Sequence, residues 1–136
     1  MCGGVIYYHN NQLITVYFPN PKASLPVKKK NGEQSLVLWG RRNNQEGSLP
    51  IGGWARLDSI HQGRWDKYFP KPVKIPALKF MEKDLMGVSH WFDVIEGQWI
   101  QGLLAQHGQE ERVYVVTIAP EHEAAIHERW PRILND

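Results

Sequence analysis

The sequence has little of what marks secreted and membrane proteins. Its 136 residues include one cysteine, Cys2, so no internal disulfide can form. No hydrophobic run approaches the roughly 18 residues that a membrane-spanning helix needs. The opening residues lack the basic segment and apolar stretch of a secretory signal peptide. These absences predict a cytoplasmic protein that contacts no membrane.

Charge bias and repetition are also slight. Sixteen Lys and Arg residues against 14 Asp and Glu give a net charge of +2, which neither requires nor excludes a nucleic-acid partner. There is no internal repeat, no low-complexity segment and no glycine-rich phosphate-binding loop. Hydrophobic residues make up 42% of the chain, which argues against disorder. We expect one domain spanning residues 1–136.

Short apolar runs separated by Gly, Pro and Asn dominate the chain, and this pattern favours β-strands. The expected strands are 5–8, 13–18, 35–39, 54–59, 73–81, 91–95, 99–104 and 113–118. Glu96-Gly97, between two of these runs, predicts a hairpin turn. The segment 19–32 is rich in Pro and Lys and is expected to be a loop.

Two helices are expected among the strands. One lies within residues 59–68. The other begins near Pro120, because proline suits the first helical position, and ends at about Arg129. Glu121 and Glu123 then lie near its positive N-terminal end, and Arg129 near its negative C-terminal end. The pattern predicts an α+β domain dominated by strands.

Cys2 carries the most distinctive chemistry of the chain. An initiator methionine is normally trimmed before a small residue, which would leave Cys2 with a thiol and a free α-amine. With an aldehyde, the amine forms an imine, and the thiol then adds to the imine carbon to close a thiazolidine ring. An α-amine titrates at about pH 8, so a useful fraction of it is neutral and nucleophilic at pH 7. The alternative is that Cys2 is a small buried hydrophobic residue.

Several short motifs follow one another along the whole chain. They are Met1-Cys2-Gly3, Tyr17-Phe18-Pro19, Leu38-Trp39-Gly40, Ala55-Arg56-Leu57-Asp58-Ser59, Ile75-Pro76-Ala77, Phe80-Met81-Glu82, Glu96-Gly97-Gln98, Val115-Val116-Thr117 and Ile126-His127-Glu128-Arg129-Trp130-Pro131. In this order they resemble the landmarks of the SRAP (SOS-response-associated peptidase) family. Its members use an N-terminal cysteine to capture abasic sites in single-stranded DNA.

The resemblance implies a set of site residues. The family's nucleophile corresponds to Cys2, its acid–base carboxylate to Glu82 and its catalytic histidine to His127. Its phosphate-binding arginines correspond to Arg56 and Arg129. These roles suit the chemistry, because opening the abasic sugar and expelling water both need proton transfer. Without the resemblance, Glu82 could lie on a solvated turn and His127 could simply stabilise a helix end.

The resemblance also implies a fold and an activity. The fold would have a barrel-like core of mixed and antiparallel sheet with a few short helices. The activity would be that of a DNA-repair protein, with self-removal of Met1 as an autopeptidase and a lyase-like covalent reaction with abasic single-stranded DNA, without cofactor or metal. Trp39 and Trp54 are candidates for stacking on unpaired bases, although core packing explains most tryptophans equally well.

The chain departs from the family pattern at several positions. Gly4 stands where the family has an arginine, which removes one phosphate contact. Trp54 stands in place of an asparagine, and an indole lacks the hydrogen-bonding groups of a carboxamide. Leu78-Lys79 replaces Asp-Gly, and Lys83 replaces a tryptophan. Two alternatives therefore stay open: a non-catalytic nucleic-acid-binding module, and an unrelated small β-rich protein with a protein partner.

Other polar patterns are less specific. His122 and His127 are five residues apart, so on a helix they point about 140° away from each other and do not form a zinc-protease motif. Lys28-Lys29-Lys30 and Arg41-Arg42 are short basic runs. Each is either a solvated surface or a point of attraction for a nucleic-acid backbone.

Overall fold

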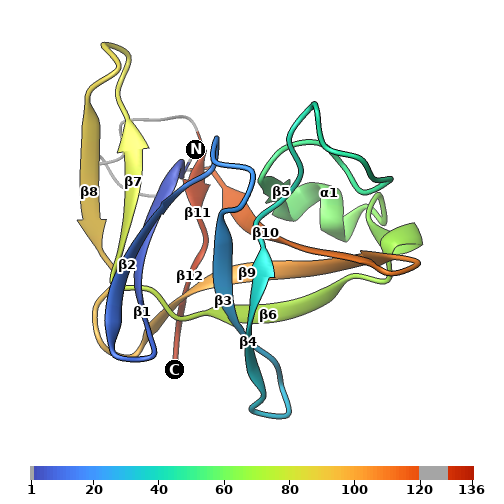
Figure 1. The fold of residues 1–136 in the computed structure, drawn as a ribbon, viewed down its shortest axis with the longest axis horizontal. Coiled ribbons are helices and arrows are strands. Elements are labelled where there is room, and N and C mark those ends of the chain that lie inside the picture. The colour runs from blue at the N-terminus through green and yellow to red at the C-terminus, as the bar shows by residue number, and fades with distance from the viewer. Residues whose placement is uncertain (1, 120–128) are drawn as a thin grey trace.

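The computed structural model describes residues 2–119 and 129–136, and strands dominate it (Figure 1). The strands are β1 (Gly4–His9), β2 (Gln12–Tyr17), β3 (Ser24–Lys28), β4 (Gln34–Leu38), β5 (Trp54–Arg56), β6 (Lys71–Ile75), β7 (Lys79–Lys83), β8 (Ser89–Asp93), β9 (Gln98–His107), β10 (Glu110–Ile118), β11 (Trp130–Pro131) and β12 (Ile133–Asn135). The described residues also contain a short helix, α1 (Leu57–His61), and a 3-10 turn, η1 (Asp66–Tyr68).

The strands form two sheets. One has four strands in the order β2-β1-β7-β8. The other has eight, along the path β11-β10-β9-β6-β3-β4, with β12 beside β9 and β5 beside β10. The strand pairs described are antiparallel except β5 with β10, which run parallel. The prediction of a strand-rich domain with mixed and antiparallel sheets is confirmed, and the described strands do not close into a barrel.

The expected single strand 73–81 was wrong, because the chain leaves one sheet and enters the other within it. β6 ends at Ile75 and β7 begins at Lys79. Pro76 has no backbone N–H and cannot continue the ladder of β6. Leu78 then donates its N–H to the carbonyl of Ile6 at 2.8 Å, which starts the second sheet. The crossing positions β7 beside β1.

The expected loop 19–32 was also wrong, because its middle is strand β3. Leu25, Pro26 and Val27 are buried there, which supplies the apolar contacts of an inner strand. Proline is tolerated because β3 pairs with β6 only through Lys28 and Lys74, so the missing N–H of Pro26 interrupts no ladder on that side.

The turn expected at Glu96-Gly97 is present, and Gly97 has a φ of +84°. It does not join a hairpin, because β8 belongs to the four-stranded sheet and β9 to the other. A tight hairpin instead joins β1 to β2 through Asn10 and Asn11, with φ values of 51° and 63°. Two successive positive φ values are what the type I′ hairpin turn requires.

The core consists of two clusters on opposite faces of the larger sheet. Val113 and Val115 of β10 belong to the cluster between the two sheets, which also contains Cys2. Tyr114 and Val116 alternate with them and belong to a second cluster, which packs under α1 and η1. Because Cys2 is part of the first cluster, packing of the two sheets fixes its surroundings.

The helical predictions are tested only in part. α1 and η1 overlap the two ends of the range 59–68, so a helical segment there is confirmed, although it is broken. The helix expected from Pro120 lies outside the described residues, apart from Arg129. No helix in the described part of the chain is long and apolar enough to span a membrane.

A close backbone approach at Gly40 gives the first testable prediction. Its φ is +57°, and a Cβ there would lie 2.2 Å from the carbonyl oxygen of Gly52. Gly108 has nearly the same φ, +59°, with nothing within 4 Å of its Cβ position. Gly108→Ala should therefore lower the free energy of unfolding by only about 1–2 kcal/mol, the cost of a left-handed backbone conformation for a residue with a Cβ. Gly40→Ala should lose about 3 kcal/mol or more, because backbone atoms must also move.

Urea unfolding of both variants measures the difference directly. Equal losses of unfolding free energy would show that the contact of Gly40 with the segment around Gly52 does not constrain the fold.

Candidate functional site

Cys2 is fixed by hydrogen bonds of the segment that precedes β1. The N–H of Gly3 donates to the carbonyl of Met81 at 2.9 Å, and the carbonyl of Gly3 accepts from the N–H of Phe18 at 3.1 Å. The Cys2 side chain is fully buried, and its Sγ donates to the carbonyl of Gly4 at 3.4 Å. The thiol therefore has a fixed position in the core.

Glu82 lies next to Cys2, on β7. The pairing of β1 with β7 sets Gly4 opposite Met81, and the electrostatic effect of Glu82 on the Cys2 thiol places the two groups near each other. Glu82 is fully buried, and burial raises the pKa of its carboxyl group. Burial and the nearby charge of Glu82 raise the pKa of the Cys2 thiol to about 12. Because Glu82 is inside a buried strand, the alternative of a solvated turn is excluded.

Trp54 contacts Cys2 directly. Its indole Nε1–H donates to the carbonyl oxygen of Cys2 at 2.6 Å. Its ring packs on Phe18, with centroids 4.8 Å apart, and edge-on against Trp39 at 6.4 Å. The indole thus supplies one hydrogen bond to the residue that carries the thiol, a contact that the sequence alone did not reveal.

The glycine at position 4 has a steric explanation. A Cβ there would lie 3.2 Å from the ring of Tyr17 and 3.3 Å from the ring of Trp91. These two rings contact each other edge to face, with centroids 6.2 Å apart. The aromatic pair occupies the space that a side chain at position 4 would need, so no arginine could be placed there without moving it.

An open groove of about 500 Å³ lies near the segment that precedes β1, and neither Cys2 nor Glu82, both fully buried, is among its lining residues. Gly3 and Met81, their sequence neighbours, are part of its wall. The remaining lining residues are Tyr17, Phe18, Pro19, Trp54, Lys83 and Ser89. The walls are mostly aromatic and apolar, and Lys83 contributes a positive charge. Such a groove suits a flat ring or a sugar with an attached phosphate.

Arg56 and Arg129 meet at Thr117. Arg56 is paired with Thr117 across β5 and β10, and Arg129 donates to the Thr117 carbonyl at 2.6 Å and to its hydroxyl at 3.2 Å. Arg56 also makes two hydrogen bonds to Asp58, at 3.1 and 2.9 Å, and these lower the pKa of Asp58 to about 2. The structure therefore brings the two predicted phosphate-binding arginines together, and a phosphate would compete with Asp58 for Arg56.

The prediction that Trp39 stacks on a base needs correction. Its ring is fully buried, and its indole N–H donates to the carbonyl of Gly53 at 3.0 Å. It packs edge-on against Phe18, with centroids 5.5 Å apart. Trp39 is a core residue that packs against Phe18, which is part of the groove wall. Of the two tryptophans, only Trp54 lines the groove.

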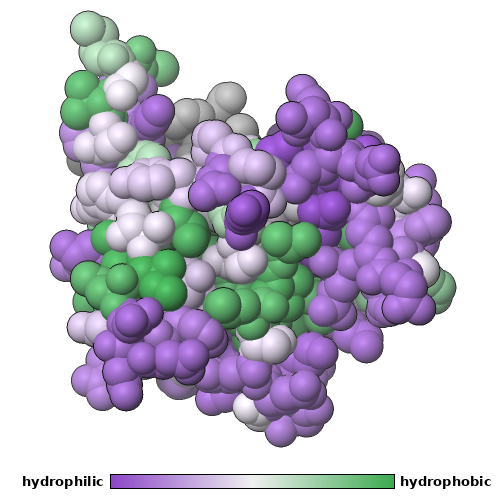
Figure 2. Space-filling view, in the orientation of Figure 1, coloured by the Kyte–Doolittle hydropathy of each residue, from purple (hydrophilic) through white to green (hydrophobic). Residues whose placement is uncertain are grey.

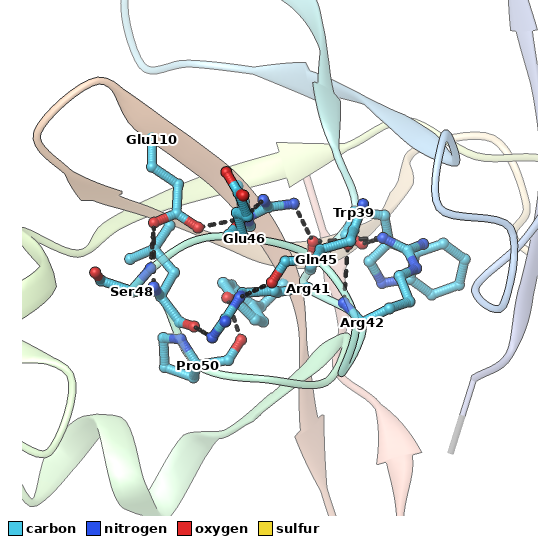
Figure 3. A network of polar contacts seen from close by, with 12 residues as sticks. Trp39, Arg41, Arg42, Gln45, Glu46, Ser48, Pro50 and Glu110 are labelled. Atoms are coloured by element: carbon cyan, nitrogen blue, oxygen red, sulfur yellow. Dashed lines mark hydrogen bonds and ion pairs between the residues drawn. The ribbon is translucent and has the colours of Figure 1, made fainter.

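Arg41 and Arg42 are structural rather than free surface cations (Figure 3). Arg41 donates to the carbonyls of Gln45 at 3.1 Å and Leu49 at 3.0 Å. Arg42 is buried and donates to the carbonyls of Phe18 and Trp39, each at 2.6 Å. Burial and the charge of Arg112 lower the pKa of Arg42. These guanidinium groups satisfy loop carbonyls that would otherwise lack partners, and they hold Phe18 in the groove wall.

His127, the third predicted catalytic residue, lies outside the described residues. Trp130, shortly after it, is described and packs against Phe80 and Phe92, with centroids 5.1 and 4.9 Å apart. Trp130 thereby anchors β11 near β7, the strand that carries Glu82.

A projecting hairpin lies beside the groove, and the sequence alone did not predict it. It joins β7 to β8, and its apolar tip protrudes at the upper left of Figures 1 and 2. Leu85 and Met86 are 98% and 87% exposed there. Asp84 holds the tip by accepting from the N–H groups of Met86 and Val88, each at 2.9 Å, and by contacting His90 at 2.8 Å. The signal in the sequence was an aspartate three residues before Gly87, a common turn pattern.

Comparison of the chain with protein-family models gives no match, and comparison with curated proteins gives none either.

Proposed function

We propose that this chain is a divergent relative of the SRAP family that binds single-stranded DNA and captures abasic sites through Cys2. The observation that carries the proposal is the position of Cys2 and Glu82. Both are fully buried, Cys2 just before β1 and Glu82 on the neighbouring strand β7, and the nearby groove, lined by Gly3 and Met81, includes an indole that also bonds to Cys2. A nucleophile, a proton donor and a place for a sugar are the parts that such a capture needs.

The reaction requires the free α-amine of Cys2, so Met1 must first be removed; the proposal includes the family's autopeptidase step for this removal. The amine attacks the aldehyde of the opened abasic sugar, and the resulting hydroxyl leaves as water to give an imine. Glu82 would donate the proton to that leaving hydroxyl, since its raised pKa favours the protonated acid. The thiol sulfur then adds to the carbon of the protonated imine, and the thiol proton passes to the Glu82 carboxylate, which restores its acid form.

The raised pKa of the thiol is compatible with this order of steps. A thiol whose pKa is about 12 keeps its proton at neutral pH. The proposal therefore makes the amine the first nucleophile and the thiol the second, because the imine carbon is more electrophilic than the aldehyde once the nitrogen is protonated. Arg56 and Arg129 would hold phosphates of the strand. On this proposal the two open sheets correspond to the family's barrel-like core.

A second candidate function is a nucleic-acid-binding module without covalent chemistry. It is favoured by the complete burial of the Cys2 thiol and by the aromatic pair that fills the space beside Gly4. Intact mass spectrometry with and without abasic single-stranded DNA separates the two candidates. A covalent adduct requires the first function, whereas reversible binding without an adduct leaves the second.

Trp54 gives a sharper prediction about the site. Trp54→Phe keeps an aromatic ring in the groove but removes the donor to the Cys2 carbonyl. Loss of one such hydrogen bond, about 1–1.5 kcal/mol, should slow crosslinking roughly tenfold. Affinity for intact single-stranded DNA should change little, because the stacking surface is kept.

The matched control for this experiment is Trp65→Phe, in the core cluster on the other face of the larger sheet. It should leave the crosslinking rate of the folded protein unchanged. If both variants react as fast as the parent chain, the bond between Trp54 and Cys2 does not position the nucleophile.

A further inference from the structure

A second hollow, of about 470 Å³, lies away from Cys2, between the β3–β4 turn, β6 and the C-terminal strand β12. Its walls include Lys28, Lys29, Lys30, Lys74 and Arg132. A smaller hollow of about 310 Å³ shares Lys29 and Lys30 and adds Lys71. In Figure 1 this region is the lower edge of the molecule, where the β3–β4 hairpin and the C-terminal end lie, and Figure 2 shows that edge to be hydrophilic.

Positive charge is concentrated at these two hollows, which we call the basic pocket. Six of the 16 Lys and Arg residues of the chain line it, although the net charge of the whole chain is only +2. Within the described residues, Lys74 is the member of this group that forms an ion pair, with Asp136 at 2.8 Å. The other five cations make no ion pair with a described carboxylate. The pocket therefore has an excess of positive charge that a polyanion would neutralise.

Two of the lysines are held close together against their repulsion. Lys28 and Lys74 stand directly opposite each other where β3 pairs with β6. Like charges in this arrangement destabilise a sheet. The ammonium groups of both lie 5.1 Å from the centroid of the Trp99 ring, whose π-electrons attract them. The indole thus offsets part of the repulsion and orders both ammonium groups before any ligand binds.

The guanidinium group of Arg132 is ordered as well. It donates through Nη1 to the side-chain oxygen of Gln101. The backbone of Arg132 is fixed between two strands. Its carbonyl accepts from the N–H of Gln101 at 2.9 Å, and its N–H donates to the carbonyl of Val116 at 2.8 Å. A guanidinium has five N–H donors, and this is the one side-chain bond that Arg132 makes within the described residues. Arg132 is among the residues that line the pocket.

We propose that the basic pocket binds consecutive phosphate groups, either of a nucleic-acid backbone or of a free polyphosphate. Lysine ammonium groups bind phosphate as point charges, and the arginine fork adds paired donors. The Trp99 ring is already contacted by two lysines, so it does not offer its face to a base. Recognition at this pocket depends on charge and is independent of base sequence. The inference requires neither Cys2 nor an abasic site.

The test uses a labelled single-stranded oligothymidylate without abasic sites, titrated over a range of salt concentrations. The double variant Lys28→Gln with Lys74→Gln should bind about tenfold or more weakly. The slope of log affinity against log salt should become less steep by about 1.4, since each lost phosphate contact on a single strand contributes about 0.7. Lys28→Arg with Lys74→Arg keeps the charge and should keep most of the affinity.

The matched control is Arg64→Gln with Lys67→Gln, two exposed cations beside η1 whose loss lowers the net charge equally. It should keep nearly the parent salt slope. Asp136→Asn should act in the opposite direction and tighten binding several-fold, because the Asp136 carboxylate competes with phosphate for Lys74.

Sodium tripolyphosphate serves as the second probe and separates the two sources of phosphate. If it binds with the same dependence on Lys28 and Lys74 while the oligonucleotide does not, the ligand is a free polyphosphate; if the oligonucleotide shows the dependence, the ligand is a strand. Equal losses in the pocket and control variants, or tighter lysine-dependent binding of polyglutamate than of either phosphate probe, would overturn the proposal. Because neither probe carries an aldehyde, these outcomes are independent of whether Cys2 forms a crosslink.

Discussion

Protein freed of Met1 should gain the mass of an abasic single strand and keep it through heating, whereas protein that retains Met1 should not. Removal of Met1 exposes an amine next to the thiol of Cys2, and only that pair closes a thiazolidine. With Met1 in place the nitrogen of Cys2 is an amide, which does not condense with an aldehyde. The expected effect is nearly complete loss of the heat-stable product, read from a denaturing gel after heating.

Cys2→Ser in the protein freed of Met1 is the matched control for the thiol. It keeps the α-amine and changes sulfur to oxygen, which closes the ring less readily. An imine should still form with this variant, but it should hydrolyse on heating. If Cys2→Ser gave as much heat-stable product as the parent, capture would not involve the thiol and the role assigned to Cys2 would be wrong.

Glu82→Gln should slow crosslinking by about 100-fold or more, the lower range for loss of general acid–base catalysis. Burial raises the pKa of the Glu82 carboxyl, so the parent chain keeps the acid form to higher pH than an exposed glutamate would. The dehydration step should therefore slow as pH rises through this raised pKa. The amide of the variant is not an acid that can supply this proton. The variant's pH–rate profile should therefore lack the fall in rate as pH rises.

A control variant and a stability measurement test whether the slower reaction is due to Glu82 acting as an acid. Glu111→Gln removes an exposed carboxylate from β10 and should react like the parent. Unfolding measured against pH gives an independent readout of Glu82. Its pKa is higher folded than unfolded, so its contribution to stability is fully present below the unfolded value and is lost as pH rises through the folded one. Glu82→Gln should flatten that decline, whereas equal pH profiles for the two proteins would contradict a raised pKa.

Much of the strand pattern could be predicted because alternating apolar runs and turn residues are local signals. β3 could not, since Pro26 and the neighbouring lysines disguised a buried strand whose stability comes from long-range packing. The turn at Gly97 was visible, but which strands pair is decided by the crossing at Pro76 between two sheets. Local sequence contains no direct signal for that choice.

The site was predictable to a similar extent. The motifs singled out Cys2 and Glu82, and pairing of β1 with β7 brings the segment of Cys2 beside the strand that carries Glu82. The motifs did not reveal that Trp39 is buried, that Arg42 bonds to Phe18, or that the Trp54 indole bonds to Cys2. Each of these contacts joins residues more than 20 positions apart or depends on burial, which composition and spacing do not encode.

The mass of the product formed by protein freed of Met1 and an abasic strand, with and without borohydride, tests the central claim most directly. Imine and thiazolidine both weigh the sum of the reactants less one water. Borohydride adds two hydrogens to an imine and leaves a thiazolidine unchanged. The account predicts an adduct on Cys2 that has lost one water and does not change with borohydride. Reversible binding without an adduct, or an adduct on a lysine that borohydride reduces, would contradict it.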